Sequence, residues 1–299
     1  MTLVVGATGL LGTEICRRLA AAGKSFRAMV RNTSDPAKKE TLKQLGADVV
    51  EADLKDWPSL DRACRGATAV VTTSTAIGSQ QEGDSFDTVD LHGQMHLVDA
   101  ARAAKVGRYI FVSVSGNLLK HGDNPLFHAK QAVENHLRQS GLTYTILRPS
   151  AFMEIWLSPH LGFDFANTKA TIYGSGQNKI SYISLHNVAD FAVAALSNPA
   201  ARNAVIELGG PDTLSPLEVV RMFEKISGRG FETQFVPEEE LQGRKMAATN
   251  PVEQTFADLM LSAAHDDSID MSDMFTKFQV RPKSVREHAE IVTSGKAGH

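Results

Sequence analysis

Short apolar runs alternate with amphipathic stretches through the first half of the chain. The apolar runs have the length of strands and end in polar or glycine-containing loops, and the stretches between them repeat apolar residues at helical spacing. This pattern predicts six strands with intervening crossovers, at residues 3–5, 26–30, 48–51, 69–73, 109–112 and 143–147. Such alternation is typical of an α/β fold with a doubly wound parallel sheet and right-handed connections.

The pattern changes after residue 150. Residues 151–185 are looser, and the rest of the chain predicts shorter elements: strands at Ile180–Ile183, Ala204–Leu208 and Phe231–Val236, and helices at Leu185–Leu196, Ser215–Ile226, Thr255–Leu261 and Ser284–Val292. We therefore expect one domain over residues 1–150 and a smaller α+β lobe over 151–299. The two are expected to interleave, with about 180–208 packing back on the sheet.

Three glycines lie between the first strand and the first helix. Gly6 allows a tight turn, Gly9 lets a pyrophosphate approach the backbone, and Gly12 lets the helix lie against the sheet. The helix N-terminus then directs free N–H groups and the positive end of its dipole at the phosphates. The alternative is an ordinary glycine-containing turn, but the position after the first strand favours a dinucleotide-binding Rossmann domain.

The residue after the second strand indicates which cofactor this domain binds. NAD(H) is usually held by an acid about 20 residues beyond the glycines. Here Arg31 and Asn32 take that place, and Lys38 and Lys39 follow. A guanidinium suits a phosphate dianion and an acid would repel it. We therefore predict NADP(H), although Arg31 could also be a solvated surface charge.

Polar residues gather at the carboxyl ends of the predicted strands, where ligands of such sheets bind. Asp53 can accept from an adenine amino group or cap a loop. Thr72, Thr73 and Ser74 leave the fourth strand, either beside the cofactor or as a strand-end cap. Ser113 and Ser115 leave the fifth strand, where a hydroxyl can polarise a substrate carbonyl or bond to its own turn.

Composition narrows the possible classes of protein. The chain has 299 residues, a net charge of −3 and 42% hydrophobic residues, so it has enough apolar residues for a large core and is no basic nucleic-acid binder. No apolar stretch reaches transmembrane length. The first strand starts beside Met1, which leaves no room for a signal peptide, and Cys16 and Cys64 fit core thiols better than a disulfide. We expect a cytoplasmic protein. His92 and His96 have i, i+4 spacing without an HExxH pattern, so no metal site is predicted.

The chain resembles the atypical short-chain dehydrogenase/reductases, in particular their NmrA-like branch of redox sensors, isoflavone-reductase-like enzymes and quinone reductases. The resemblance covers about residues 1–240. It rests on Gly6-Ala7-Thr8-Gly9-Leu10-Leu11-Gly12, Val30-Arg31, Ala52-Asp53-Leu54, His128-Ala129-Lys130-Gln131-Ala132-Val133-Glu134, Tyr144-Thr145-Ile146-Leu147-Arg148-Pro149 and Gly209-Gly210-Pro211.

The resemblance implies that the glycine loop, Arg31 and the exit of the fourth strand hold NADP(H). The expected cofactor-binding residues are Gly6, Thr8, Gly9, Leu10, Leu11, Gly12, Arg31, Asp53, Leu54, Thr72, Thr73, Ser74 and Lys130. Standard members place a Tyr four residues before the active-site Lys, and this chain has Leu126 there. The Tyr–Lys pair is therefore broken, and some NmrA-like enzymes are similar in keeping only the Lys.

Lys130 and Ser113 are the candidate catalytic residues. Lys130 lies early in the helix predicted at Leu126–Ser140. An ammonium there can bond ribose hydroxyls or protonate a developing oxyanion, or it can be a solvated surface lysine. His128 is a weaker candidate proton donor, because it points about 200° away from Lys130 around the helix.

An apolar, aromatic segment follows the sixth strand and suits a flat hydrophobic substrate. The candidate substrate residues are Ser115, Phe152, Met153 and Trp156, of which the apolar ones could instead be core of the small lobe. The predicted function is NADP(H)-dependent reduction of a small apolar carbonyl, quinone or enone by a monomer or homodimer. The alternatives are a non-catalytic NADP(H) sensor that contacts a protein partner, and an epimerase or dehydratase of a nucleotide-linked sugar.

Overall fold

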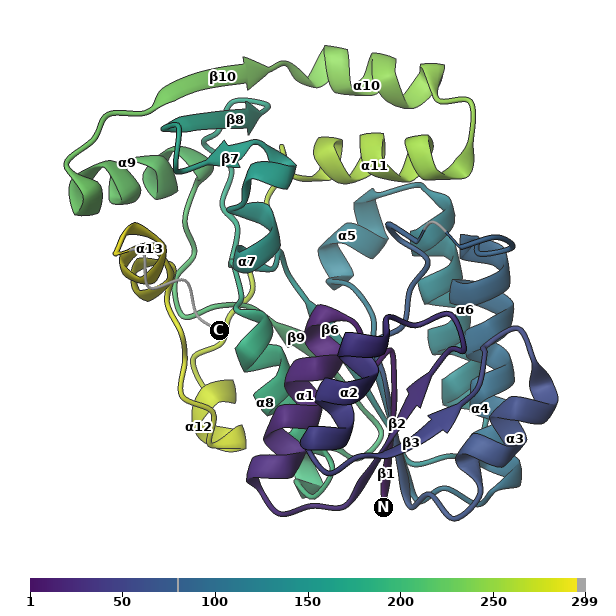
Figure 1. Cartoon of the computed structure of the whole chain (residues 1–299). Coiled ribbons are helices and arrows are strands. Elements are labelled where there is room, and N and C mark those ends of the chain that lie inside the picture. The colour runs from purple at the N-terminus through teal and green to yellow at the C-terminus, as the bar shows by residue number, and fades with distance from the viewer. Residues whose placement is uncertain (80, 295–299) are drawn as a thin grey trace. The chain divides into compact units, whose positions relative to one another are not determined.

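Seven strands form the main sheet of the computed structural model, which describes residues 1–79 and 81–294 (Figure 1). The strand order is β3-β2-β1-β4-β5-β6-β9, and all five pairings from β3 to β6 are parallel. The chain order reverses between β1 and β4, which is the switch point where such sheets bind ligands. The strands are β1 (Thr2–Val5), β2 (Phe26–Val30), β3 (Asp48–Glu51), β4 (Ala69–Thr72), β5 (Arg108–Val112), β6 (Tyr144–Pro149) and β9 (Ala204–Leu208).

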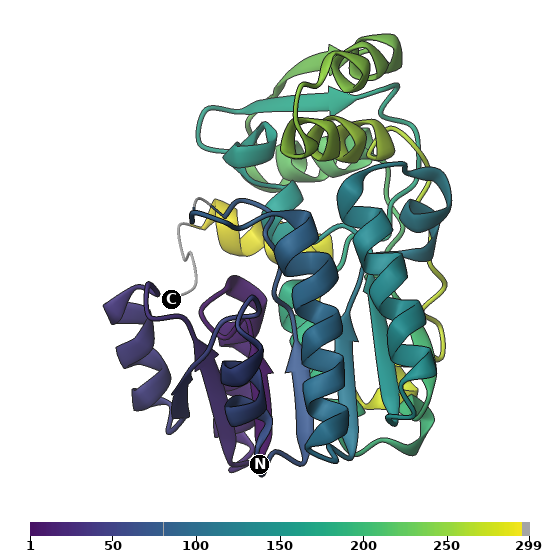
Figure 2. The same cartoon turned by 90° about the vertical axis from the view of Figure 1, so that its right-hand side faces the viewer.

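Helices cover both faces of this sheet (Figures 1 and 2). One face carries α1 (Leu10–Ala21), α2 (Pro36–Gln44) and α8 (Leu185–Ala195), and the other carries α3 (Trp57–Cys64), α4 (Gln94–Ala103) and α6 (Pro125–Gln139). A π-helical segment, η1 (Phe86–Gly93), runs directly into α4, and a 3-10 turn, η3 (Pro199–Ala201), precedes β9. Because helices cover both faces, all four residues of β1 and of β4 are buried.

The chain divides into two compact units. The first comprises residues 1–114, 125–148 and 188–206, and the second comprises 115–124, 149–187 and the residues from 207 onward. The expected functional boundary at residue 150, with a cofactor domain before it and a substrate lobe after it, stays a prediction.

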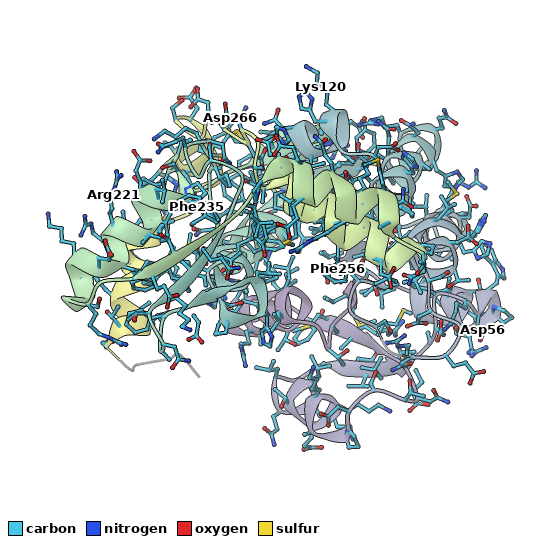
Figure 3. All side chains as sticks on the ribbon, turned by 90° about the horizontal axis from the view of Figure 1, so that it is seen from above. Asp56, Lys120, Arg221, Phe235, Phe256 and Asp266 are labelled. Carbon is cyan, nitrogen blue, oxygen red and sulfur yellow. The ribbon has the colours of Figure 1, made fainter. Side chains whose placement is uncertain are left out.

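The second unit is built on a three-stranded sheet of order β10-β8-β7, in which β8 and β10 are parallel and β7 is antiparallel to β8. Its core contains Phe163 and Phe223, with ring centroids 4.7 Å apart. Phe235 and Phe256 remain exposed on its surface (Figure 3). The elements are α5 (Gly116–His121), α7 (Met153–Trp156), η2 (Pro159–Leu161), β7 (Phe163–Asp164), β8 (Lys169–Tyr173), α9 (Pro216–Ser227), β10 (Glu232–Val236), α10 (Glu238–Ala247), α11 (Pro251–Ser262), α12 (Met274–Phe278) and α13 (Val285–Thr293).

The structure confirms the doubly wound parallel sheet and the smaller α+β part. It differs at Ile180–Ile183, where the expected strand is replaced by isolated bridges to residues such as Leu214 and Phe152. The sequence also failed to predict β8, which lies in the glycine-rich segment, and α10. Leu241 is the buried residue of α10, so this helix has almost no apolar stripe to reveal it.

Candidate functional site

The turn after β1 depends on two glycines. Gly6 has a φ of +83°, and a Cβ on it would lie 2.8 Å from Thr73 Oγ1 and 2.9 Å from the Ser74 nitrogen. A Cβ on Gly12 would lie 2.0 Å from the carbonyl oxygen of Gly6, because α1 packs directly against the turn. Both positions therefore exclude any side chain on steric grounds.

Gly9 has a different environment from the other two glycines. It is the N-cap residue of α1 with an ordinary φ of −80°, and the nearest atom to a Cβ there would be the Gly6 carbonyl oxygen at 3.3 Å. No side chain caps α1, and its first turn holds no acid. The helix N-terminus thus keeps its positive character available for an anion that approaches over Gly9.

A pocket opens beside this turn, at the carboxyl ends of β1, β2 and β3 and the loop after β4. It lies within the first unit and brings together six of the predicted cofactor residues: Gly6, Thr8, Arg31, Asp53, Leu54 and Ser74. Its other lining residues are Val5, Met29, Val30, Ser34, Ala52, Thr75, Asp84 and Val89. The other seven predicted cofactor residues are not among the described residues that line this pocket: Gly9, Leu10, Leu11, Gly12, Thr72, Thr73 and Lys130.

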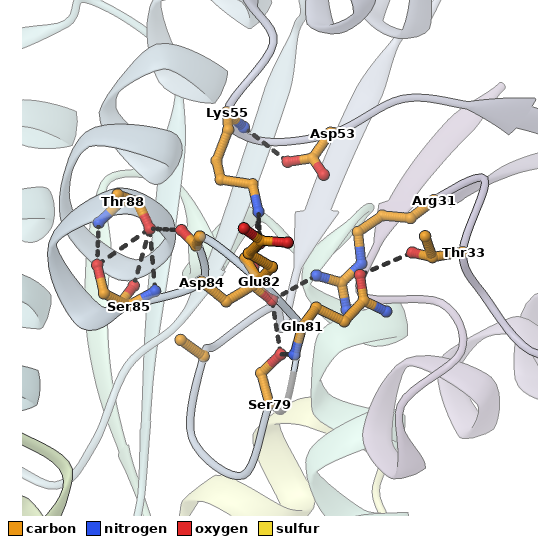
Figure 4. A network of polar contacts seen from close by, with 12 residues as sticks. Arg31, Thr33, Asp53, Lys55, Ser79, Gln81, Glu82, Asp84, Ser85 and Thr88 are labelled. Carbon is orange, nitrogen blue, oxygen red and sulfur yellow. Dashed lines mark hydrogen bonds and ion pairs between the residues drawn. The ribbon is translucent and has the colours of Figure 1, made fainter.

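Arg31 meets a carboxylate that the sequence did not point to. Its Nη1 lies 2.5 Å from Oδ2 of Asp84, which also accepts from Ser79 Oγ at 2.6 Å, and Lys55 Nζ pairs with Oδ1 (Figure 4). The side chain of Asp84 is 2% exposed, against 32% for Arg31 and 29% for Lys55. Burial opposes ionisation of Asp84, but the hydrogen bonds from Lys55, Ser79 and Arg31 outweigh it and hold its pKa below the usual range.

Asp53, which lines the pocket, and Lys39 on α2 are bonded to the backbone of nearby residues. Asp53 Oδ1 accepts a hydrogen bond from the backbone nitrogen of Lys55 at 2.8 Å. Asp53 therefore caps its own loop, which was the alternative to a contact with adenine. Lys39 Nζ donates to the Asn32 carbonyl oxygen at 2.9 Å, and Lys38 is exposed. Arg31 and Lys55 are therefore the cations that converge on Asp84.

The two threonines at the end of β4, Thr72 within the strand and Thr73 directly after it, bond to the protein itself. Thr72 Oγ1 donates to Gln94 Oε1 at 3.1 Å, and Gln94 Nε2 donates to the Ser74 carbonyl oxygen at 3.0 Å. The Thr73 nitrogen donates to the Val5 carbonyl oxygen at 3.0 Å. Thr72 and Thr73 thus hold the end of β4 against its neighbours, while Ser74 also reaches the pocket.

Lys130 is buried rather than solvated. Its Nζ lies 3.6 Å from Asp90 Oδ1, 3.5 Å from the Val112 carbonyl oxygen and 5.1 Å from the centre of the Phe111 ring. Asp90 is completely buried on η1, and its Oδ2 accepts from the Ala76 nitrogen at 2.8 Å. An ammonium in this setting has a fixed position and a counterion.

Two buried polar atoms near this lysine have no hydrogen-bond partner within the described part of the chain. They are Asp90 Oδ1 and Ser113 Oγ, and Ser113 directly follows Val112. Buried polar atoms normally bond to protein, water or ligand, so each of these two atoms is a candidate for a bond to water or to a ligand. Lys130 is buried and His128 is exposed, so these two residues lie on different faces of α6 as the spacing indicated. Leu126 is buried as well.

The predicted substrate residues all lie in the second unit. Ser115 Oγ donates to Asp267 Oδ1 at 2.7 Å, and Ser150 Oγ donates to Asp267 Oδ2 at 2.6 Å. Met153 is fully buried in the core of this unit, and Trp156 packs against that core. Phe152, half-buried, is the N-cap residue that precedes α7. Met153 and Trp156 therefore have the core role that was the alternative for them, and their binding role stays a prediction.

The sequence reasoning missed four polar residues that organise these sites: Lys55, Asp84, Asp90 and Asp267. Lys55 could have been found, because it follows the third strand by four residues at the same sheet edge as Arg31. Asp84 and Asp267 lie in loops and Asp90 lies within η1, far along the chain from Arg31, Ser115 and Lys130, respectively. No local pattern marks them.

In residues 1–79 and 81–294, no three His, Cys, Asp or Glu side chains are grouped closely enough to hold a metal ion. None of the helices described is both long and apolar enough to cross a membrane.

The glycine turn, the uncapped α1 and the pocket at the switch point of a parallel sheet define a Rossmann-type α/β protein. Comparison with known families then gives the particular one: residues 1–278 match the NmrA-like family, and the chain belongs to it.

Proteins that are similar to this chain in sequence or in structure have different named roles. The chain is 31% identical to "Isoflavone reductase homolog IRL" of Zea mays, over 79% of this chain and 77% of that protein. It is 30% identical to "Photosystem II assembly factor Ycf39" of Cyanophora paradoxa, over 79% and 71%. Among solved structures, the quinone oxidoreductase QOR2 of Escherichia coli complexed with NADPH superposes with a TM-score of 0.77 at 22% identity, over 98% of this chain and 99% of that one.

Proposed function

We propose that this protein is an NADP(H)-dependent reductase of a small apolar carbonyl, quinone or enone. One observation carries the proposal: Gly6 and Thr8, from the turn that leads into the uncapped N-terminus of α1, line the same pocket as the Arg31 guanidinium. A dinucleotide with an extra phosphate needs these features together, because each of its phosphates requires its own source of positive charge.

The residues present fit this cofactor. The glycine turn and the N-terminus of α1 would hold the pyrophosphate, and Arg31 would hold the 2′-phosphate. Asp53 and Leu54 line the pocket that would receive the adenosine end. QOR2 of Escherichia coli, whose solved structure is a complex with NADPH, has the same fold, which supports the assignment.

Bound NADPH supplies a hydride, and the protein supplies position and polarity. In our proposal Lys130 binds a ribose hydroxyl and stabilises negative charge that develops on the substrate oxygen. Asp90 keeps the ammonium in place at 3.6 Å. Ser113 Oγ, buried and without a partner among the described residues, is available to bond the ribose or the substrate oxygen.

The aromatic side chains of the second unit support the proposed class of substrate. Phe152 and Trp156 are half-buried and offer aromatic surface, whereas the Ser115 hydroxyl is buried and donates to Asp267. Flat apolar molecules gain most from such surroundings. The resemblance to an isoflavone reductase homolog supports an aromatic substrate.

The test is loss of NADPH absorbance in the presence of quinones, enones and aromatic ketones, with calorimetry of NADPH binding alongside. Turnover that depends on both NADPH and Lys130 would support the reductase. Failure to bind NADPH at all would overturn the proposal at its first step.

A second function is favoured by one observation. Leu126 takes the place four residues before Lys130 and is buried, so α6 offers no phenol as a proton donor there. A protein that binds NADP(H) without turnover, and contacts a partner protein according to the cofactor's redox state, needs no such donor. Tight NADPH binding, no turnover of any screened compound and redox-dependent partner binding would favour this sensor.

A further inference from the structure

Three segments bring two cations and one carboxylate together at the rim of the cofactor pocket. Arg31 follows β2, Lys55 follows β3, and Asp84 precedes η1. Arg31 and Lys55 each contact a different oxygen of the Asp84 carboxylate (Figure 4). Asp84 thus holds both cations of this cluster, in the way that an anionic ligand would.

The structure fixes Asp84 in this position from both sides. The next residue, Ser85, caps η1 in a reciprocal pair with Thr88, at 3.0 Å and 2.9 Å. Upstream, Gln81 Oε1 accepts from Thr33 Oγ1 at 2.7 Å, which joins this segment to the loop after Arg31. The carboxylate is buried while both cations keep about a third of their side-chain surface exposed. An incoming anion can therefore reach the cations.

We propose that Arg31 and Lys55 together bind the 2′-phosphate of NADP(H), and that Asp84 competes for both cations and so sets the choice of cofactor. The inference rests on the proposed binding of NADP(H) and adds two residues, Lys55 and Asp84, to the determinants of cofactor choice. A phosphate monoester brings nearly two negative charges and three acceptor oxygens, so it can replace a carboxylate on two cations. An uncharged 2′-hydroxyl cannot, which leaves Asp84 in place when NAD(H) binds.

Competition by Asp84 predicts the direction in which each substitution changes ligand affinity. Asp84 lowers the affinity for any ligand with a 2′-phosphate, because its pairs with Arg31 and Lys55 must be exchanged and its charge repels the phosphate. Removing the carboxylate should tighten only such ligands, and removing Lys55 should weaken only such ligands.

The probes are adenosine 2′,5′-bisphosphate and adenosine 5′-monophosphate, measured by calorimetry on the full chain. They differ only in the 2′-phosphate, and neither contains the nicotinamide, so the result does not depend on turnover. Asp84→Asn is expected to tighten the bisphosphate by about tenfold or more, from the usual strength of a charge-assisted contact. Lys55→Met is expected to weaken it by a similar factor. The monophosphate should change by less than about twofold in both variants.

Glu82→Gln is the matched control, because it removes an exposed negative charge two residues from Asp84 in the same segment. If it tightens the bisphosphate as much as Asp84→Asn does, the effect is general electrostatics and the proposal is overturned. An unchanged bisphosphate-to-monophosphate ratio in Asp84→Asn also overturns it. So does weaker binding of the monophosphate, which would make Asp84 a ligand of the ribose 2′-hydroxyl.

Lys55→Met keeps the test decisive even where Asp84→Asn does not fold, since Lys55 lies at the surface. Full bisphosphate affinity in this variant would rule out the two-cation site. Failure of the unmodified protein to bind NADPH or either probe is a separate result, and it would end the proposed cofactor function as well.

Discussion

Lys130 Nζ lies 3.6 Å from Oδ1 of Asp90, and both side chains are buried. The pair joins α6 to η1, which the sequence separates by the whole of α4 and β5. A buried pair of this kind contributes little net stability by itself, but leaving either partner alone is costly, because the remaining charge has lost its counterion.

Asp90→Asn should therefore destabilise the protein by about 3 kcal/mol, measured by urea unfolding. The double variant Asp90→Asn/Lys130→Met should lose less than the sum of the two single variants, by roughly 1–3 kcal/mol, because it leaves no unpaired charge. Asp87→Asn, an exposed aspartate on the same helix, is the control and should change little. Strict additivity would show that the two side chains do not interact.

Lys130→Met should lower kcat by about 10²–10⁴ at saturating NADPH if the ammonium stabilises charge on the substrate oxygen. If Lys130 only binds the ribose, the KM for NADPH should rise with kcat nearly constant. Lys130→Met also removes the counterion of Asp90 and so lowers the stability of the protein. The activity is therefore measured well below the melting temperature of the variant. His128→Ala is the matched control on the exposed face of α6 and should stay active. A dead His128→Ala with a fully active Lys130→Met would show that the wrong residue was chosen.

Gly9 and Gly12 should respond differently to the same substitution. Gly12→Ala places a Cβ 2.0 Å from the Gly6 carbonyl oxygen and should lower the melting temperature sharply. Gly9→Ala meets only that oxygen, at 3.3 Å, and its φ of −80° suits alanine, so the fold should survive. Its NADPH affinity should nevertheless collapse, because the methyl group occupies the space of the pyrophosphate. Full NADPH affinity in a folded Gly9→Ala would show that the turn does not hold phosphate.

Local patterns were enough to predict the parts of the fold and site that lie close together in sequence. Gly6, Gly9, Gly12 and the start of α1 form one short segment, and the strand pattern around it predicted the sheet. Arg31 could be predicted because the residue directly after the second strand of such a domain contacts the 2′ position of the ribose.

Asp84, the partner of Arg31, could not be predicted from a local pattern, because it lies 53 positions further along the chain in a loop without strand or helix pattern. Ser115 and Asp267 are 152 positions apart, and only the folded second unit brings them together. Burial was equally hidden: the periodicity placed Lys130 and His128 on different faces of α6 but could not say that the lysine is the buried one. Long-range pairing, not residue type, limited the prediction.

Arg31 should determine whether NADPH binds better than NADH. Arg31→Met removes one cation of the cluster while the other, Lys55, remains on Asp84. NADPH affinity should fall by about 10- to 100-fold, as expected for loss of a charged phosphate contact, and NADH affinity should change little. Arg31→Asp should lower NADPH affinity further and also reduce stability, because it places a second carboxylate beside Asp84. Equal affinities of the unmodified protein for NADPH and NADH in calorimetry would contradict the predicted preference.

His288 should make stability depend on pH. It is buried on α13, and its Nε2 has no hydrogen-bond partner within the part of the chain described. Burial lowers its pKa, Lys283 and His186 lower it further, and Glu154 acts in the opposite direction. The unfolded chain therefore binds a proton more readily than the folded one, so this contribution is complete above the usual histidine pKa of about 6.5 and is lost as pH falls through the lower folded value.

The free energy of unfolding in urea should therefore decrease from pH 7 to pH 5. His288→Leu cannot take up a proton, so its slope against pH over this range should be flatter. His160→Leu is the control, since His160 is exposed and should leave the slope of the unmodified protein unchanged. If His288→Leu and the unmodified protein lose stability in parallel on acidification, the proton is taken up elsewhere and His288 is not the cause.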